Sequence, residues 1–121
     1  MVSKEIAQRA RKFGRRIIEL HDKLKRNGGA ARELAPQILK SGASIGANLE
    51  EATARQTKPD FITKVCIARK EAREVVYWLK LLIESGLSDR SEVAWELDEA
   101  EQLVRILTAI IINARSNPDR G

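Results

Sequence analysis

Cysteine, histidine and long apolar runs are almost absent from this sequence. Its 121 residues include one cysteine, Cys66, and one histidine, His21, so no internal disulfide can form and no cluster of Cys and His ligands can surround a metal. There is no run of about 18 uncharged apolar residues, which a helix needs to cross a membrane. The start of the chain is basic and polar and lacks the apolar segment of a secretion signal. We therefore expect a cytoplasmic protein with no membrane contact.

Aromatic residues and prolines are scarce as well. Aromatic side chains make up 4% of the chain, and there are three prolines, Pro36, Pro59 and Pro118. The residues that dominate instead, such as Ala, Leu, Ile, Glu, Lys and Arg, favour helices. A chain of this length suits one domain with a single core of ordinary size. We therefore expect one all-α domain over residues 1–121.

The spacing of apolar residues predicts four helices. These residues recur alternately four and three positions apart, in segments that end at glycine, proline or capping residues. The predicted helices span about residues 4–26, 31–56, 59–85 and 89–115. Short connections make neighbouring helices antiparallel, so we predict an antiparallel up-down-up-down four-helix bundle. The apolar seam of the first helix consists of Ile6, Ala10, Phe13, Ile17, Leu20 and Leu24.

The second helix carries two glycines four residues apart, Gly42 and Gly46. Each costs a helix roughly 0.5–1 kcal/mol relative to alanine, and close packing against a neighbouring helix would offset that cost. Asn48 either fixes helix register as a buried polar residue or reaches a ligand at the surface. Glu51 can hold a basic residue from a neighbouring helix. We assign a structural role to Gly42, Ser44, Gly46, Asn48 and Glu51.

The third helix has a second stripe outside its main apolar seam. The stripe repeats every four and three residues and comprises Ile67, Glu71, Glu74, Trp78 and Leu81. One interpretation is that Trp78 covers an end of the bundle. The other is contact between subunits, because exposed apolar stripes with a large aromatic residue often anchor interfaces. Further apolar residues on the fourth helix, Leu103, Ile106 and Ile110, favour the second interpretation, so we predict a homo-oligomer.

Charge is distributed unevenly along the chain. Residues 1–40 carry a net charge of +7 and the remainder carries −2, whereas the net charge of the whole is +5. Seven acidic residues fall between Glu84 and Glu101, against Arg90 alone. Such polarity indicates either a face for an anionic partner or complementary surfaces between subunits.

A basic row on the first helix is the main candidate for a binding site. Rows of this kind neutralise phosphates without reading base sequence. The alternative is an ordinary solvated helix face. The predicted nucleic-acid-binding residues are Arg9, Lys12, Arg15, Arg16 and Lys23.

The sequence contains no catalytic constellation. A di-iron bundle requires two Glu-x-x-His pairs, and His21, the single histidine, has no glutamate three residues before it. Phosphate-binding loops, dinucleotide fingerprints and nucleophile elbows are missing too. We therefore predict no enzymatic activity, no metal and no cofactor.

Two motifs resemble those of the 23S rRNA intervening-sequence proteins. The segment SIGANLEEATAR is similar to the family's helix-two pattern through Ser44, Ile45, Asn48, Leu49 and Glu51, with Ala52 where the family usually has glycine. The segment IARKEAREVVYWLKLL is similar to the helix-three pattern through Lys70, Glu71, Glu74, Tyr77, Trp78 and Leu79. The resemblance covers about residues 4–115.

This resemblance implies a four-helix bundle that assembles as a homopentamer and is often encoded within or near ribosomal RNA intervening sequences. RNA binding is the role usually suggested for the family. The accessory variability protein of diversity-generating retroelements is similar in being a basic pentamer, and it partners a reverse transcriptase and RNA. We hypothesise a non-enzymatic oligomer that binds nucleic acid, preferably RNA over DNA; the alternative is a scaffold or accessory subunit that docks a protein partner such as a reverse transcriptase.

Overall fold

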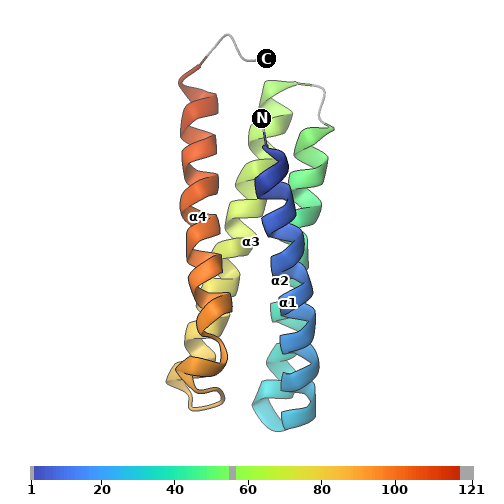
Figure 1. Ribbon diagram of the computed structural model, residues 1–121, viewed down its shortest axis with the longest axis vertical. Coiled ribbons are helices and arrows are strands. Elements are labelled where there is room, and N and C mark those ends of the chain that lie inside the picture. Colours follow the sequence, from blue (N-terminus) through green and yellow to red (C-terminus); the bar gives the residue numbers. More distant parts are fainter. Residues whose placement is uncertain (1, 55–56, 118–121) are drawn as a thin grey trace.

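The structure, a computed structural model, describes residues 2–54 and 57–117. These residues form four long helices and a short 3-10 helix, without strands: α1 (Lys4–Asn27), α2 (Gly29–Thr53), α3 (Lys58–Glu84), η1 (Arg90–Glu92) and α4 (Ala94–Arg115). The helices run alongside one another, and the α1–α2 and α3–α4 connections lie at the same end of the molecule (Figure 1). The predicted all-α four-helix bundle is confirmed.

Capping residues and glycines mark where helices begin and end. The side chain of Ser3 accepts a hydrogen bond from the backbone N–H of Ile6 at the start of α1, and Thr57 accepts one from Asp60 at the start of α3. Two turns use glycine in the left-handed region, Gly28 with φ 71° and Gly86 with φ 72°. Other residues are strained at such φ values, so these glycines set the positions of both turns at one end of the bundle.

The fourth helix begins five residues later than the predicted start at residue 89. Asp89 caps the short helix η1 instead, because its side chain and that of Glu92 each bond to the other residue's backbone N–H. Val93 then leaves helical geometry, with φ −122° and ψ 13°, before α4 starts. The second helix begins at Gly29 and continues through Pro36. Its predicted end, Gln56, lies outside the described residues.

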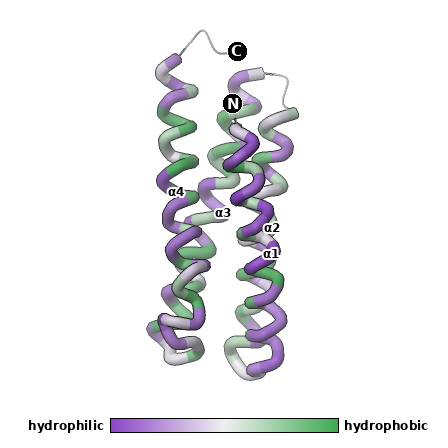
Figure 2. The backbone as a smooth tube through the Cα atoms, in the orientation of Figure 1, coloured by the Kyte–Doolittle hydropathy of each residue, from purple (hydrophilic) through white to green (hydrophobic). Residues whose placement is uncertain are grey.

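The predicted seams supply most of the core. Each helix has one buried apolar face, so apolar and polar residues alternate along every helix in Figure 2. The sequence pattern places Leu103 among the surplus apolar residues at the surface of the fourth helix. That placement is wrong, because Leu103 belongs to the core and is fully buried. Ile106 and Ile110 are half-buried. Among the helices described, none is both long and apolar enough to span a membrane.

Helix packing is uneven around the bundle. Neighbours in sequence pack extensively, whereas α1 and α4 meet along a narrower seam. The closest approach of α1 and α2 is at Gly42, where a Cβ atom would lie 2.7 Å from Cγ2 of Ile17. At Gly46 a Cβ atom would stand at an ordinary 3.7 Å from Cβ of Ala10. Close packing of α1 against α2 therefore requires glycine at position 42. Polar side chains and Trp95 fill the narrower seam between α1 and α4.

Candidate functional site

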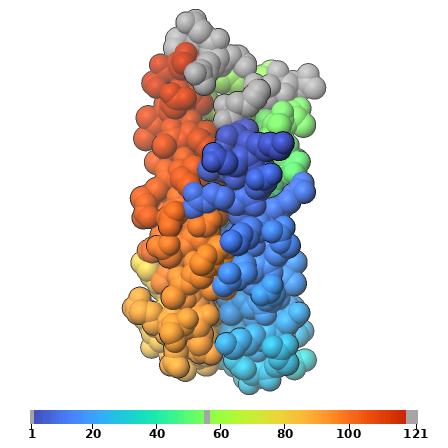
Figure 3. All heavy atoms as spheres, viewed as in Figure 1, coloured from blue at the N-terminus to red at the C-terminus, as the bar shows by residue number. Residues whose placement is uncertain are grey.

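A polar seam joins α1 to α4 along the face shown in Figure 3, where the two helices lie side by side. Arg9 donates hydrogen bonds to both carboxylate oxygens of Glu99, at 3.0 and 2.8 Å, and a further one to Gln102 at 2.9 Å. The Glu99 side chain is 12% exposed. The hydrogen bond to Glu99 raises the pKa of Arg9 above its ordinary value. This arginine therefore stays charged and compensates a nearly buried carboxylate.

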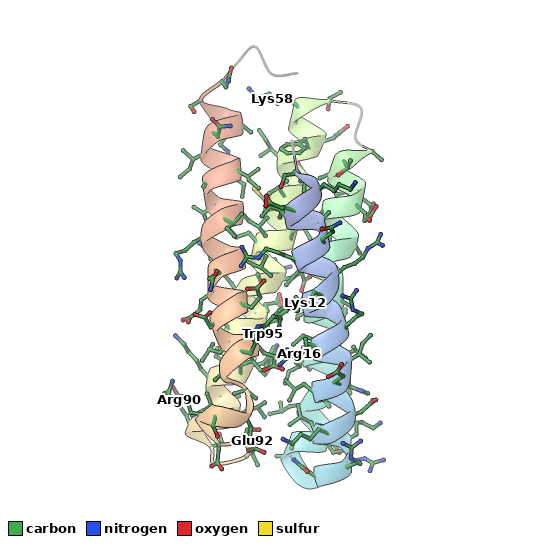
Figure 4. All side chains as sticks on the ribbon, viewed as in Figure 1. Lys12, Arg16, Lys58, Arg90, Glu92 and Trp95 are labelled. Atoms are coloured by element: carbon green, nitrogen blue, oxygen red, sulfur yellow. The ribbon has the colours of Figure 1, made fainter. Side chains whose placement is uncertain are left out.

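Trp95 of α4 fills the middle of the same seam. Its ring stacks against Phe13, with centroids 6.3 Å apart. The guanidinium of Arg16 lies over the ring at 4.2 Å and the ammonium of Lys12 at 5.5 Å (Figure 4). Arg16 also pairs with Glu96 at 3.5 Å, and that carboxylate is only 8% exposed. Lys12 and Arg16 of α1 thus both contact the aromatic face of Trp95 in α4, and Arg16 alone also pairs with a carboxylate.

The lower end of the seam is closed by Lys23 and Glu92, whose charged atoms are 2.9 Å apart. Glu92 also accepts a hydrogen bond from the backbone N–H of Asp89. This backbone hydrogen bond, followed by the contact with Lys23, lowers the pKa of Glu92. Lys23, the last residue of the predicted basic row, therefore contacts η1, where the carboxylate of Glu92 balances its charge.

Three of the five predicted nucleic-acid-binding residues therefore have acidic partners in α4 or η1. They are Arg9, Arg16 and Lys23. Lys12 and Arg15 have no acidic partner within the described parts of the chain. The uneven charge of the sequence is thus partly matched inside one chain, a solution that the sequence interpretation had not included.

Sequence reasoning missed Trp95, Glu96 and Glu99 as members of this seam. A usable signal was present. Arg9, Arg16 and Lys23 recur every seven residues, and Glu92 and Glu99 are also seven apart. In an antiparallel pair of helices, residues late in the first helix face residues early in the second. Lys23 therefore faces Glu92, and Arg9 faces Glu99.

Another group of cations lies at the α1–α2 connection. Lys25 and Arg26 belong to the last turn of α1, and the first turn of α2 contains no acidic residue. Arg26 and Arg32 are exposed, and Lys25 is half-buried. None of the three has an acidic partner among residues 2–54 and 57–117. This end of the bundle, defined by Lys25, Arg26 and Arg32, is called the basic hairpin end below.

The polar motif residues of α2 make two contacts within their own helix and one with α3. Ser44 donates a hydrogen bond to the carbonyl of Lys40, and the amide of Asn48 donates one to the carbonyl of Ser44. Both bonds stay within α2, and Asn48 is half-buried. Glu51 pairs with Lys64 of α3 at 3.2 Å. Of these contacts, only the Glu51–Lys64 pair therefore joins α2 to α3, and Asn48 has no hydrogen-bond partner on another helix in the part of the chain described.

The predicted interface stripe of α3 is half-buried in the single chain, and this holds for all five of its residues, Ile67, Glu71, Glu74, Trp78 and Leu81. Tyr77, next to the stripe in sequence but not part of it, is exposed, with 59% of its surface accessible. The Tyr77 and Trp78 rings meet edge to face, with centroids 5.1 Å apart. A shallow hollow of about 340 Å³ lies beside them, lined also by Lys70, Arg73 and Glu74. We call this surface the α3 aromatic edge.

A second hollow, of about 330 Å³, runs between α1 and α2 on the outside of the bundle. Its floor consists of small residues of both helices, and the exposed Ile18 stands at its edge. Arg11 and Arg15 also line it, and Arg11 pairs with Glu50 across it at 2.7 Å. We call this the α1–α2 groove; its small residues are Ala7, Ala10, Gly14, Ala43, Gly46 and Ala47.

Metal-binding geometry was also considered for the described residues. Within residues 2–54 and 57–117, His, Cys, Asp and Glu side chains nowhere gather in a group of three or more that could hold a metal ion.

The sequence matches the protein family described as 23S rRNA-intervening sequence protein over residues 3–109. The fold is similar to the crystal structure of a protein of unknown function from the S23 ribosomal protein family of Bacteroides thetaiotaomicron VPI-5482. The two share 35% sequence identity over 88% of this chain and 97% of that one, with a TM-score of 0.81. No curated protein matches the chain.

Proposed function

This chain belongs to the 23S rRNA-intervening sequence protein family, and we propose that it is a non-enzymatic, oligomeric protein that binds RNA through contacts with phosphates. The observation that carries the proposal is the basic hairpin end. Its cations Lys25, Arg26 and Arg32 lie near the α1–α2 turn and have no acidic partner within the described residues. Unpaired cations can neutralise phosphates without first losing a protein contact.

The proposal moves the phosphate contacts away from most of the predicted basic row. Arg9 and Arg16 hold carboxylates that are nearly buried, and a phosphate that took either arginine would leave one of them uncompensated. Such a loss makes these arginines poor ligands for RNA. Lys12 remains available, because it rests on Trp95 without an acidic partner in the described structure.

Oligomerisation strengthens this function. The resemblance to the family implies a pentamer, and a ring of parallel copies would repeat the basic hairpin end on one side. Once one copy holds an RNA strand, the others bind at a raised effective concentration, so affinity rises without new kinds of contact. A few cations per subunit can then hold an RNA that a single subunit binds weakly.

RNA binding can be tested by neutralising the basic hairpin end. The variant Lys25→Gln/Arg26→Gln/Arg32→Gln removes three charges, and the matched control Lys4→Gln/Lys40→Gln/Arg105→Gln removes three exposed charges elsewhere. Fluorescence anisotropy with a labelled single-stranded RNA should show at least about tenfold weaker binding for the hairpin variant than for the control at moderate salt. Equal losses in the two variants would contradict the proposed site. Protein captured from a lysate after nuclease treatment, without RNA binding in vitro, would favour the scaffold hypothesis instead.

A further inference from the structure

We infer that the α3 aromatic edge of one subunit docks into the α1–α2 groove of a second copy of this chain. The inference rests on the oligomeric part of the proposed function and names the two surfaces that meet. The aromatic edge shares Glu74 and Trp78 with the stripe that the sequence predicts on α3. The other surface combines small residues of α1 and α2 and forms only when these two helices are packed together.

The groove contains a glycine that its own chain does not explain. A Cβ atom at Gly14 would have no neighbour within 4 Å in the described part of the chain. Glycine inside a helix costs roughly 0.5–1 kcal/mol relative to alanine, and at Gly42 the close contact with Ile17 accounts for that cost. No contact among residues 2–54 and 57–117 accounts for it at Gly14. A partner lying close against the groove would do so, because a side chain at position 14 would then occupy the partner's space.

The α3 aromatic edge projects from the surface, whereas the α1–α2 groove is hollow, so the two shapes are complementary. Tyr77 projects from α3 with 59% of its surface accessible, and Trp78 supports it edge to face. Ile18, 50% exposed at the groove, is the complementary projection, and the hollow beside Tyr77 and Trp78 is the complementary recess. Each surface therefore offers one apolar projection and one apolar recess to the other.

Groups of opposite charge are available on the two surfaces, although the cations Lys70 and Arg73 also line the aromatic edge. Arg15 lines the groove and has no acidic partner in the described chain, whereas Arg11 is already paired with Glu50. Glu71 and Glu74 beside the aromatic edge have no basic partner among the described residues. Docking would bring Arg15 of one copy to these carboxylates of the next. This identifies a second copy as the occupant and assigns Arg15 to the subunit contact instead of to RNA.

The contact is between unlike surfaces, so every copy has one groove and one edge to offer. Contacts of this kind are heterologous, and they build a closed ring when the rotation between copies closes. A two-fold dimer that used only one of these surfaces would instead place edge against edge or groove against groove. The mass of the assembly formed by single variants, and by a mixture of two variants, can distinguish these arrangements.

The first test is a charge exchange read by size-exclusion chromatography with light scattering. Arg15→Glu and Glu74→Arg should each weaken assembly by at least about tenfold in concentration, because like charges then face each other across the contact. The double variant Arg15→Glu/Glu74→Arg should recover most of the wild-type mass. Arg105→Glu, an exposed control on α4, should leave the mass unchanged. A double variant no better than the single ones would overturn this pairing.

The second test separates unlike from like surfaces. Gly14→Trp fills the groove where the chain leaves open space, and Tyr77→Asp removes the aromatic projection; circular dichroism checks that both fold. Each variant alone should be monomeric, and an equimolar mixture should give a heterodimer through the one intact contact. Wild-type mass for Gly14→Trp alone, a monomeric mixture or a monomeric wild-type protein would each overturn the inference. The hairpin variant Lys25→Gln/Arg26→Gln/Arg32→Gln should keep wild-type mass whether or not it loses RNA, so failure of the RNA site remains distinguishable.

Discussion

Arg9 of α1 and Glu99 of α4 are joined by two hydrogen bonds, of 3.0 and 2.8 Å, although 90 residues separate them in the chain. With Arg16–Glu96 and Lys23–Glu92, this pair joins the basic first helix to the acidic segment that includes η1 and the start of α4. Trp95 lies between these pairs. The seam between α1 and α4 is therefore joined by these ion pairs and by Trp95, which stacks on Phe13.

Replacing Arg9 by methionine should destabilise the protein. Methionine keeps an apolar stem but leaves Glu99, which is 12% exposed, without its cation. Breaking a fully buried pair costs roughly 3–5 kcal/mol, and because the Arg9 side chain is 35% exposed we expect about 2 kcal/mol here. Urea denaturation followed by circular dichroism measures this loss.

The double variant Arg9→Met/Glu99→Leu is the control for that prediction. It removes both charges, so no uncompensated carboxylate remains, and it should regain most of the lost free energy of unfolding. A double variant as unstable as Arg9→Met alone would show that packing by the Arg9 stem, and not the charge pair, stabilises the seam.

Gly42→Ala should destabilise the bundle, whereas Gly46→Ala should not. The new methyl group at position 42 would lie 2.7 Å from Cγ2 of Ile17, a β-branched side chain that is stiff in a helix. Overpacking of this kind costs about 1–3 kcal/mol and exceeds the gain in helix propensity. At position 46 the nearest atom is 3.7 Å away, so the propensity gain remains. Thermal unfolding of both variants compares them, and equal behaviour would contradict the close approach at Gly42.

The pair Lys23–Glu92 should make stability depend on pH in the acidic range. The folded state lowers the pKa of Glu92 through the Asp89 N–H first and Lys23 second. Stability from this group is therefore complete above the ordinary glutamate pKa of about 4.3, and it is lost as the pH falls through the lower folded-state pKa. Urea midpoints for wild type and Glu92→Gln should differ at neutral pH and converge in acid. A difference that stays constant down to about pH 2.5 would rule out this linkage.

The bundle itself could be predicted from apolar spacing, because heptad seams and turn residues act locally. The residues Phe13, Ile17 and Leu24 were placed on the buried face of the first helix, and all three are fully buried. The start of α4 was harder. Asp89 is a good cap by sequence, yet it caps a 3-10 turn, since Glu92 returns a bond to its backbone N–H.

The surfaces were less predictable than the core, because they depend on which helices become neighbours. Arg9 and Arg16 form a regular basic row in the sequence, but their charges are balanced by residues more than 75 positions away. Tyr77 was noted only as part of a motif, and its exposure follows from the rotation of α3 in the bundle. The groove beside Gly14 exists only once α1 and α2 are packed.

The most direct test of the proposed function is the salt dependence of RNA binding. Plotted as the logarithm of affinity against the logarithm of salt concentration, the wild-type protein should give a steep negative slope. Lys25→Gln/Arg26→Gln/Arg32→Gln should make that slope shallower by about 2, because each phosphate contact on a single strand contributes about 0.7. An affinity that ignores salt, or a slope unchanged by the three substitutions, would contradict phosphate binding at the basic hairpin end.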